Sequence, residues 1–289
     1  MDGDLMSIET SYRKILIPTD GGENTRGAIG YAIDLARQIG AEVTALSVND
    51  ITNYAAIPGE PDLESPLYQM SQAAVRGVVE AAASQGVSAQ GMVVSGIPQR
   101  DIVEVSEDHD LVVMGTVGRT GVPHLLLGSV AEKVIRHARC PVIVVRAGGA
   151  PVFRCERMLI ATDGSDSSGA AITHGLRLAK AFQASVTALS VNDGRDKVVE
   201  SAEGEGRTAD VAVNKVVEEG RELGVTVEPV VMTGSPADVI VEMSERYDIL
   251  VMGTHGRSGL ALLRLGSVAE KVIRHSRCPV MVVKPGMRT

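Results

Sequence analysis

Two glycine-rich segments of this chain have the residue types and the spacing that bind phosphate groups. The first is Gly115-Thr116-Val117-Gly118, followed after nine residues by Gly128-Ser129, and the second repeats this pattern from Gly253 to Ser267. Each follows a short apolar run and precedes an amphipathic stretch that begins Gly-Ser-Val-Ala-Glu. Unpaired N–H groups at a helix start attract anions, and glycine lets the main chain approach the anion's oxygen atoms closely. The pattern therefore predicts two anion sites at strand-to-helix junctions.

The elements that must position these loops alternate between strand and helix. In the first half, strand-like apolar runs cover 14–19, 42–48, 87–95, 111–114 and 141–145, and helical periodicity covers 23–39, 65–85, 98–107 and 128–138. Such alternation indicates a parallel sheet that is covered on both faces. Ligands bind beyond the carboxyl ends of its strands, where the strand order reverses. With the order 3-2-1-4-5, Asp20 and the first glycine loop meet at that crevice.

A long internal repeat indicates that this arrangement occurs twice. Residues 128–145 match residues 266–283 at all but two positions, and residues 44–50 are identical to residues 187–193. A repeat of this length is a whole domain. We therefore expect one domain at 1–148 and another at 149–289, joined near residues 146–157, where two glycines and a proline interrupt the pattern.

Composition argues against several classes of partner. The net charge of −8 does not suit duplex DNA or RNA, which need a basic face, and the lack of Trp with only two Phe removes stacking surfaces for single strands. No apolar run reaches the length of a membrane span, and the N-terminus is acidic where a signal peptide is basic. The three cysteines lack metal-type spacing and are expected as reduced, buried thiols. We therefore expect a cytoplasmic protein with no nucleic-acid partner and no membrane partner.

The glycine pattern, the Asp after the first strand of each half and the Cys-Pro-Val strand that ends each half together resemble the universal stress protein family. The resemblance is to its ATP-binding branch, whose pattern is Gly, two residues, Gly, nine residues, Gly and then Ser or Thr, and it covers essentially the whole chain. It implies an α/β fold of two tandem doubly wound, Rossmann-like domains of the adenine nucleotide alpha hydrolase type. Each would hold a five-stranded parallel sheet of order 3-2-1-4-5. The implied ligand is ATP, with Mg²⁺ or Mn²⁺ bound through its phosphates.

The resemblance also assigns parts of the nucleotide to positions in each half. The glycine loop and the residues after it would bind phosphates and ribose, the first-strand Asp and its preceding Thr would lie by ribose and adenine, and apolar residues at strand ends would hold adenine. In the first half these are Gly115, Gly118, Gly128, Ser129 and Val130; Thr19 and Asp20; and Val48 and Met114. In the second half they are Gly253, Gly256, Gly266, Ser267 and Val268; Thr162 and Asp163; and Val191 and Met252. Arg119 and Arg257 follow the second glycine and could add charge at the triphosphate, with a solvated side chain as the alternative.

The function implied is a nucleotide-regulated stress-response or signalling protein, with no catalytic and no metal-ligating residues of its own. The Walker A Lys is absent and no clear carboxylate base accompanies the phosphates, so fast turnover is not expected. Two alternatives stay open, namely a slow ATP hydrolase and an interaction module with vestigial pockets. Val117 stands where the second half has His255, and Gly22 where it has Ser165, so the equivalence of the two sites also stays open. The sequence does not choose ATP over AMP or cyclic AMP, and it does not identify the stress or the downstream partner.

The last strand of each half would be an exposed apolar sheet edge on its own. Members of the family commonly pair at this strand, so we expect an internal pseudo-dimer of the two domains through residues 141–145 and 279–283. Whether two chains then associate as a homodimer is left open by the sequence.

Overall fold

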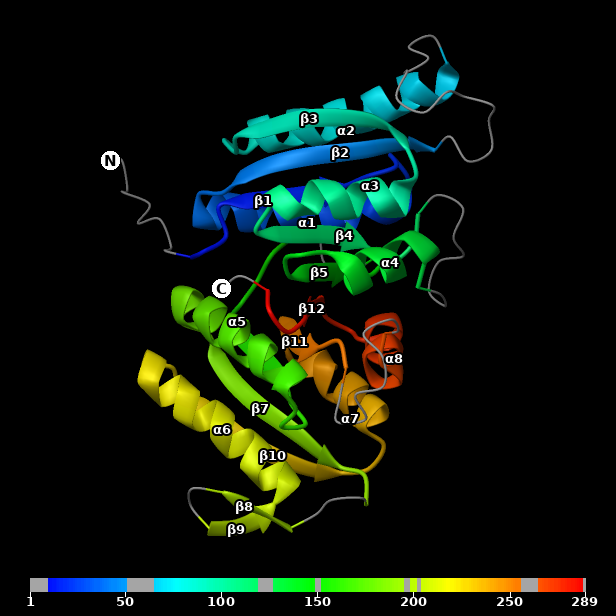
Figure 1. Cartoon of the computed structure of the whole chain (residues 1–289). Helices are drawn as coiled ribbons and strands as arrows, with labels where there is room; N and C mark the ends of the chain where they lie inside the picture. Colours follow the sequence, from blue (N-terminus) through cyan, green and yellow to red (C-terminus); the bar gives the residue numbers. More distant parts are fainter. Residues whose placement is uncertain are drawn as a thin grey trace, which may run out of the picture.

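One ten-stranded sheet runs through the whole chain in the computed structural model (Figure 1). The structure describes residues 10–50, 65–118, 127–148, 152–194, 198–201, 204–255 and 265–287. The strand order is β10-β7-β6-β11-β12-β5-β4-β1-β2-β3. Read inward from its outer edge to the centre of the sheet, each half has the order 3-2-1-4-5 that the sequence predicts, so the expected fold class is confirmed.

Among its described residues, the first half contains five parallel strands and four helices. Its strands are β1 (Lys14–Pro18), β2 (Glu42–Asp50), β3 (Ala89–Gly96), β4 (Leu111–Gly115) and β5 (Val142–Val145). Its helices are α1 (Arg26–Ile39), α2 (Pro66–Ser84), α3 (Pro98–Val105) and α4 (Ser129–His137), with 3-10 turns η1 (Glu23–Thr25) and η2 (Ser106–Asp108). Proline at the first position of α2 and of α3 suits a helix start, because its missing N–H has no intrahelical partner there.

The second half repeats this order and adds one hairpin. Its strands are β6 (Arg157–Ala161), β7 (Ser185–Asn192), β10 (Val227–Thr233), β11 (Ile249–Gly253) and β12 (Val280–Val283). Its helices are α5 (Asp166–Phe182), α6 (Thr208–Leu223), α7 (Pro236–Met243) and α8 (Ser267–His275), with the 3-10 turn η3 (Ser244–Arg246). The antiparallel hairpin β8 (Val198–Ser201) and β9 (Gly204–Arg207) was not expected from the sequence, and it lies at the end of the molecule furthest from the first half (Figure 1).

The two halves meet at the seam between β5 and β12. These strands pair antiparallel, with Val280 opposite Val144, Met281 opposite Ile143 and Val282 opposite Val142. All residues of both strands are buried. The predicted pairing of the two domains through these strands is therefore confirmed, and each apolar edge is covered by the other.

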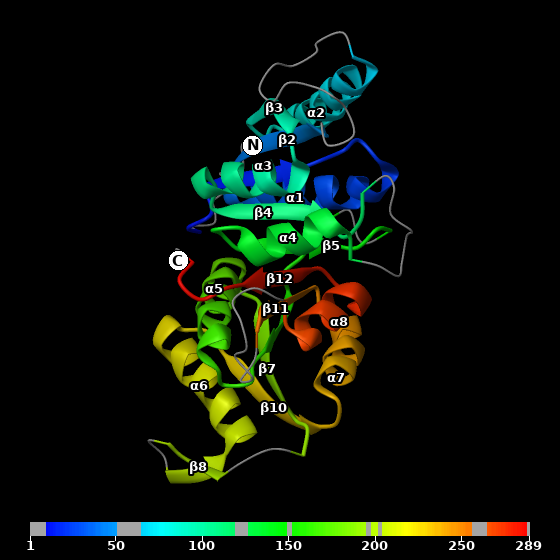
Figure 2. The ribbon, with the colours of Figure 1, turned by 45° about the vertical axis from the view of Figure 1, so that its right-hand side comes forward.

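Both hydrophobic cores cross this seam. One lies on the sheet face covered by α1, α2, α5 and α6, and the other lies on the face covered by α3, α4, α7 and α8 (Figures 1 and 2). Each core contains buried residues from both halves. The pairs of strands at the seam are thus sandwiched between shared layers, and the two halves bury apolar surface together.

The segment that connects the halves takes part in the first of these cores. Phe153 packs its ring against Tyr31 of α1 and Phe182 of α5, with ring centroids 5.2 and 4.8 Å away. Its backbone N–H donates to Asp34 Oδ2 at 3.1 Å, and its carbonyl accepts from Gln38 Nε2 at 3.3 Å. The described part of the connection is therefore a packed structural element.

Two further observations concern the expectations drawn from composition. No helix among the described residues is long and apolar enough to cross a membrane. Cys140, Cys155 and Cys278 are free and buried, and burial raises the pKa of the first two to about 12 and that of Cys278 to about 11. Thiols in this state stay protonated at neutral pH and act as small apolar side chains.

Candidate functional site

The strand order reverses between β1 and β4, and the predicted site residues of the first half gather at the carboxyl ends of these strands. From β1 the chain passes through α1 to β2 on one side, whereas β4 lies on the other side. Thr19 and Asp20 directly follow β1, and Gly115 is the last residue of β4. The residues that the sequence pattern predicts therefore lie where parallel sheets of this type bind their ligands.

Asp20 and Gly118 lie against each other in this crevice. A Cβ atom placed on Gly118 would lie 2.7 Å from Asp20 Oδ2, and the other carboxylate oxygen of Asp20 accepts from the Gly22 N–H at 2.9 Å. The carbonyl of Gly118 accepts from Asn24 Nδ2 at 3.0 Å. The end of β1, the η1 turn and the start of the glycine loop are thus fastened together at one place.

Helix α4 begins beside this loop without a side-chain cap. Its N-cap is Gly128, in extended conformation, and no side chain among the described residues accepts a hydrogen bond from the first turn. The N–H of Gly128 itself donates to the carbonyl of Thr116 at 2.8 Å, which holds the helix start against the loop. The N–H groups of Ser129 and Val130 are orphan donors of the first turn and carry the positive end of the helix dipole. Such donors are what the predicted anion site requires.

The second half builds the same arrangement around Asp163 and α8. Gly266 is the uncapped N-cap of α8 among the described residues, and its N–H donates to the carbonyl of Thr254 at 2.9 Å. Asp163 Oδ1 accepts from the N–H of Ser165 at 3.0 Å and from the hydroxyl of Ser165 at 2.6 Å. Gly22, the counterpart of Ser165, has no hydroxyl. Within its own turn, Oδ1 of Asp163 therefore accepts two hydrogen bonds, whereas Oδ1 of Asp20 accepts one.

Four of the loop glycines also have a packing reason to be glycine. A Cβ atom would lie 2.8 Å from the Ser167 carbonyl at Gly253 and 2.9 Å from the Thr254 carbonyl at Gly266. At Gly115 and Gly128 it would lie 3.2 Å from the carbonyls of Asn24 and Thr116. A substitution at these positions therefore tests folding as well as binding. Among the loop glycines that the structure describes, only at Gly118 would a Cβ atom meet a side chain, the carboxylate of Asp20, which is able to move.

The expected adenine contacts divide into two kinds. Val48 and Val191 are half-buried near the ends of β2 and β7, whereas Met114 and Met252 are each 6% exposed. All four pack with the core on the α3, α4, α7 and α8 face. The methionines chiefly fill that core, so the two valines have more surface to offer a planar base.

Three of the predicted residues, Arg119, Gly256 and Arg257, lie outside the described residues. The remaining predicted residues of the first half lie at the carboxyl ends of β1, β2 and β4 or at the start of α4. Those of the second half lie at the carboxyl ends of β6, β7 and β11 or at the start of α8. Thr19 and Thr162 are buried, and their hydroxyls accept from the N–H groups of Gly21 and Gly164 at 3.1 Å. These threonines shape the turn that presents the carboxylate.

Sequence reasoning missed the residues that brace the turn after each aspartate. Asn24 holds the Gly118 carbonyl, and the hydroxyls of Thr25 and Ser168 donate at 2.7 Å to the carbonyls of Gly22 and Ser165. The recurrence of a hydroxyl residue five positions after Asp20 and after Asp163 is a signal that could have found Thr25 and Ser168. The residue of the second half that corresponds to Asn24 is Ser167, so the internal repeat gives no signal at this position.

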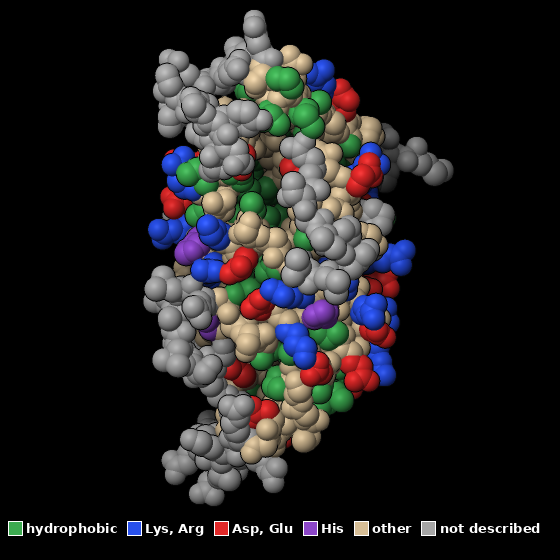
Figure 3. Space-filling view, turned by 90° about the vertical axis from the view of Figure 1, so that its right-hand side faces the viewer, with side chains coloured by type: hydrophobic (Ala, Val, Ile, Leu, Met, Phe, Trp, Pro, Cys, Tyr) green, Lys and Arg blue, Asp and Glu red, His purple; other side chains and the backbone are tan. Residues whose placement is uncertain are grey.

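The chemistry that this arrangement offers is the binding of anions through backbone groups. Among the described residues no group of three or more His, Cys, Asp or Glu side chains could hold a metal ion. Acidic and basic side chains are interspersed over the face in Figure 3, rather than gathered into a single charged surface. The described part of each crevice therefore supplies directed N–H donors, one carboxylate and apolar walls.

Comparisons of this chain with known proteins all point to one protein family. The model of the universal stress protein family matches residues 11–146 and again residues 155–284. A universal stress protein of Methanocaldococcus jannaschii is 41% identical over 143 residues, which are 48% of this chain and 84% of that protein. One of Mycobacterium tuberculosis is 29% identical over 310 residues, which cover 96% of this chain and 99% of that protein.

Solved structures show the same fold over the full length. A universal stress protein from Archaeoglobus fulgidus superposes with a TM-score of 0.74 at 23% identity, covering 94% of this chain and 96% of that one. Two other universal stress proteins have been solved with cAMP and with dAMP. They superpose on about half of this chain with TM-scores of 0.40 and 0.36, which say nothing of the ligand here.

Proposed function

The chain belongs to the universal stress protein family as a tandem of two family domains, and we propose that each domain binds one ATP as a regulatory ligand. The domain boundaries proposed are 1–148 and 149–289. The observation that carries the proposal is the uncapped start of α4 and of α8, each beside a glycine loop at a strand-order reversal. The phosphates would lie at these helix starts, with the loop glycines admitting them to the backbone.

The carboxylates fix the direction in which the nucleotide would lie. Asp20 and Asp163 would repel phosphate but accept hydrogen bonds from ribose hydroxyls, so they belong at the sugar end. Val48 and Val191 then lie at the adenine end, where a flat apolar base needs nonpolar walls. A divalent cation, Mg²⁺ or Mn²⁺, would be held through the phosphates, since the described residues offer no cluster of side chains for it.

Such contacts suffice for useful affinity. Three or four hydrogen bonds to phosphate oxygens are worth about 1.5–3 kcal/mol each. Together with burial of adenine they offset an association cost of about 4–15 kcal/mol. A dissociation constant on the order of 1 μM, about 8 kcal/mol, is therefore within reach.

We propose binding without efficient turnover. The loops carry no Walker A Lys, and the carboxylate beside each loop is assigned to the sugar end. The occupied and empty states would present different surfaces to a downstream partner, since a ligand shifts populations only through its different affinity for two states. We place this activity in the cytoplasm.

Mass spectrometry of the protein as purified, followed by incubation with MgATP, tests the proposal. Two retained ATP molecules per chain, displaced by added ATP more readily than by AMP or cyclic AMP, are the expected result. Rapid accumulation of ADP would instead identify a hydrolase. Empty crevices with no thermal shift on adding any of the three nucleotides would identify an interaction module.

Substitution of Gly118 by Trp tests the placement of the phosphates. The bulky side chain would displace Asp20 and fill the loop, so ATP stoichiometry should fall from two to one while the chain stays folded. Gly77→Ala is the matched control, because a Cβ at this position of α2 meets nothing within 4 Å. Unchanged stoichiometry in Gly118→Trp would refute the placement.

A further inference from the structure

Two clefts lie at the seam, at the amino ends of β4 and β11 and hence away from the crevices at the carboxyl ends of these strands. The first encloses about 680 Å³ and the second about 420 Å³. They occupy equivalent places in the repeat, because Asp110, Arg139 and Cys140 line the first where Asp248, Arg277 and Cys278 line the second. The pair of clefts therefore allows a direct comparison of their side chains.

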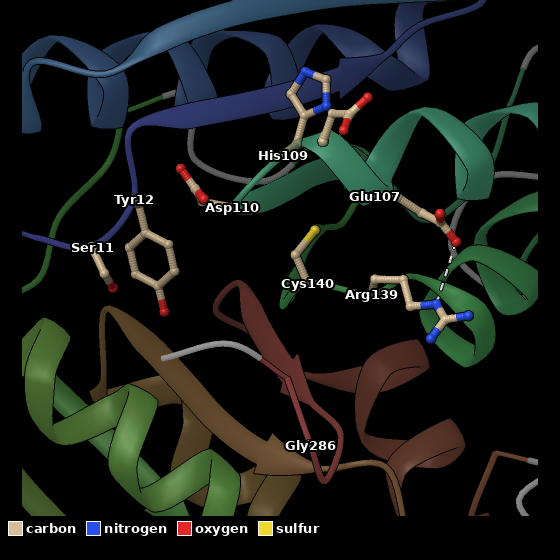
Figure 4. Close-up of a pocket in the computed structure, with 9 residues that line it drawn as sticks. Ser11, Tyr12, Glu107, His109, Asp110, Arg139, Cys140 and Gly286 are labelled. Atoms are coloured by element: carbon tan, nitrogen blue, oxygen red, sulfur yellow. Dashed lines mark ion pairs between the residues drawn. The ribbon is translucent and has the colours of Figure 1, made fainter.

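The first cleft is rich in acidic groups (Figure 4). Glu107, Asp108 and Asp110 line it, and the lining Arg139 forms an ion pair with Glu107, with Nε 3.3 Å from Oε1. Asp110 Oδ2 accepts from the N–H groups of Arg13 and Lys14 at 2.8 and 2.9 Å. The acidic side chains outnumber Arg139 and His109, the basic side chains among the described lining residues.

The second cleft is rich in arginine. Arg146 follows β5, Arg154 lies in the connecting segment and Arg277 lies between α8 and β12, and all three line it. Asp248 is the acidic group among the described lining residues. Its Oδ2 accepts hydrogen bonds from the backbone N–H groups of Glu156 and Arg157, at 3.0 and 2.8 Å. This concentration of positive charge occurs in a chain whose net charge is −8.

In the repeat Arg277 has Arg139 as its counterpart and Arg146 has Lys284, so the added basic residue is Arg154. Arg154 stands at the position of Ser11 in the first cleft, and Tyr247 stands at the position of His109. Burial, and after it the charge of Arg277, lowers the pKa of Arg146. Two of the three guanidinium groups are thus close enough to repel each other, which an anion between them would relieve.

A second observation at the same cleft concerns the hydroxyl of Tyr31. This side chain lines the cleft and is 1% exposed, and its hydroxyl has no hydrogen-bond partner among the described residues. Burial, and then the neighbouring Cys155, Cys278 and Asp248, raises the pKa of Tyr31, so the hydroxyl stays a donor. Two of these neighbours, Cys278 and Asp248, also line the cleft.

We propose that the second cleft binds a small phosphate-bearing anion, with the guanidinium groups of Arg146, Arg154 and Arg277 as its charge partners and the Tyr31 hydroxyl as a neutral donor. Guanidinium groups present paired donors that match the oxygen atoms of a phosphoryl group. The volume of about 420 Å³ exceeds that of one phosphate and leaves room for a second phosphoryl or a small organic group.

The ion pairs around the cleft do not oppose this assignment. Arg277 lies 3.3 Å from Glu245, and both side chains are more than half exposed, so the pair is weak and a ligand can compete for the arginine. Arg139 and Glu107 form the equivalent pair at the same distance in the first cleft. Arg139 is therefore a matched control for Arg277, since its loss removes the same charge and the same kind of pair.

Calorimetric titration of the nucleotide-free full chain with sodium pyrophosphate in Tris-chloride buffer tests the proposal. We expect a class of site whose dissociation constant rises about tenfold in Arg277→Ala and in Arg154→Ala, the loss of one charge-assisted bond, and about threefold in Tyr31→Phe. Arg139→Ala should change it less than about twofold. Repeating the titration with inorganic phosphate tells whether one phosphoryl group suffices or a second is required.

Two results would overturn the assignment. Equal weakening in Arg139→Ala and Arg277→Ala would mean that pyrophosphate responds only to overall charge. Binding that is unchanged in the Arg277 and Arg154 variants but loses one site per chain in Gly118→Trp would place the anion at the nucleotide crevices instead. That second result would leave the proposed nucleotide function intact, so the two proposals fail separately.

Discussion

His174 is a buried base held between the two halves. Its Nδ1 and the Tyr12 hydroxyl form a hydrogen bond of 2.8 Å, the ring is 1% exposed, and its Nε2 has no partner among the described residues. Burial, and after it the charge of Arg177, lowers the pKa of His174 to about 4. The neutral ring is therefore the form that the folded chain accommodates.

The pH dependence of unfolding should report this histidine. An unfolded His has a pKa of about 6.5, so below that pH the unfolded chain binds a proton that the folded chain refuses. The stabilisation is fully present above pH 6.5 and falls as the pH drops toward 4, by about 2 kcal/mol at pH 5. Urea unfolding at pH 7.5 and pH 5 measures it, and His174→Phe should lose less stability between the two. Identical losses in both proteins would contradict the assignment.

At single positions the sequence predicts the residues of the candidate site better than it predicts the residues that hold them in place. Asp20 and Gly118 carry recognisable chemistry, and the structure brings them into contact as the strand order requires. Asn24, which holds the Gly118 carbonyl, was not predicted. A side-chain bond to a loop carbonyl depends on the exact path of two distant segments, and many residue types could make it, so it leaves no pattern.

At the level of elements, each half places a cation on a helix end of the other. Arg146, just after β5, donates from Nη1 to the carbonyls of Ser276 and His275 at the end of α8, at 2.9 and 3.3 Å. Lys284, its repeat equivalent after β12, donates to the carbonyl of Arg136 near the end of α4 at 2.9 Å. Both satisfy terminal carbonyls and meet the negative end of a helix dipole.

Removing these cations should weaken the seam by unequal amounts. Arg146→Met loses two hydrogen bonds and should lower the free energy of unfolding by about 1 kcal/mol. Lys284→Met should cost less, because burial, the main cause that lowers the Lys284 pKa to about 8, already offsets part of what its bond contributes. Urea unfolding at pH 7 measures both. A larger loss for Lys284→Met would mean that its burial carries no such penalty.

The regular elements were predicted closely, and the irregular addition was not. Repeated apolar runs located β4, β5 and their counterparts to within one residue, because buried parallel strands are continuous apolar segments. The segment 23–39 proved to be a 3-10 turn followed by a helix. The hairpin β8–β9 escaped notice, since Gly204-Glu205-Gly206-Arg207 has neither apolar alternation nor β-branched residues.

For the whole molecule, the connection between the halves is as much a part of the core as the seam. Phe153 is 2% exposed and touches aromatic rings from both halves, whereas the neighbouring Val152 is 49% exposed. The sequence predicted the strand pairing but treated this region as an interruption, because two glycines and a proline precede Phe153. One aromatic residue in such surroundings has no periodicity that could mark it as buried.

Truncation of Phe153 should therefore destabilise the entire chain. Phe153→Ala removes a buried ring between α1 and α5 and should lower the free energy of unfolding by about 3 kcal/mol. Val152→Ala, at an exposed position beside it, should stay within about 0.5 kcal/mol of the parent. Thermal and urea unfolding compare the two. Equal small effects would show that the aromatic cluster contributes little to joining the halves.

The antiparallel seam joins two lobes that are alike in backbone and free to differ in side chains. In an assembly of two identical subunits every substitution appears twice, so both empty lobes respond to a ligand at the same concentration. In this chain the two halves differ at such positions: His255 of the second half corresponds to Val117 of the first, and Ser165 corresponds to Gly22. A single polypeptide of this build can acquire two thresholds for one signal and so spread its response over a wider concentration range.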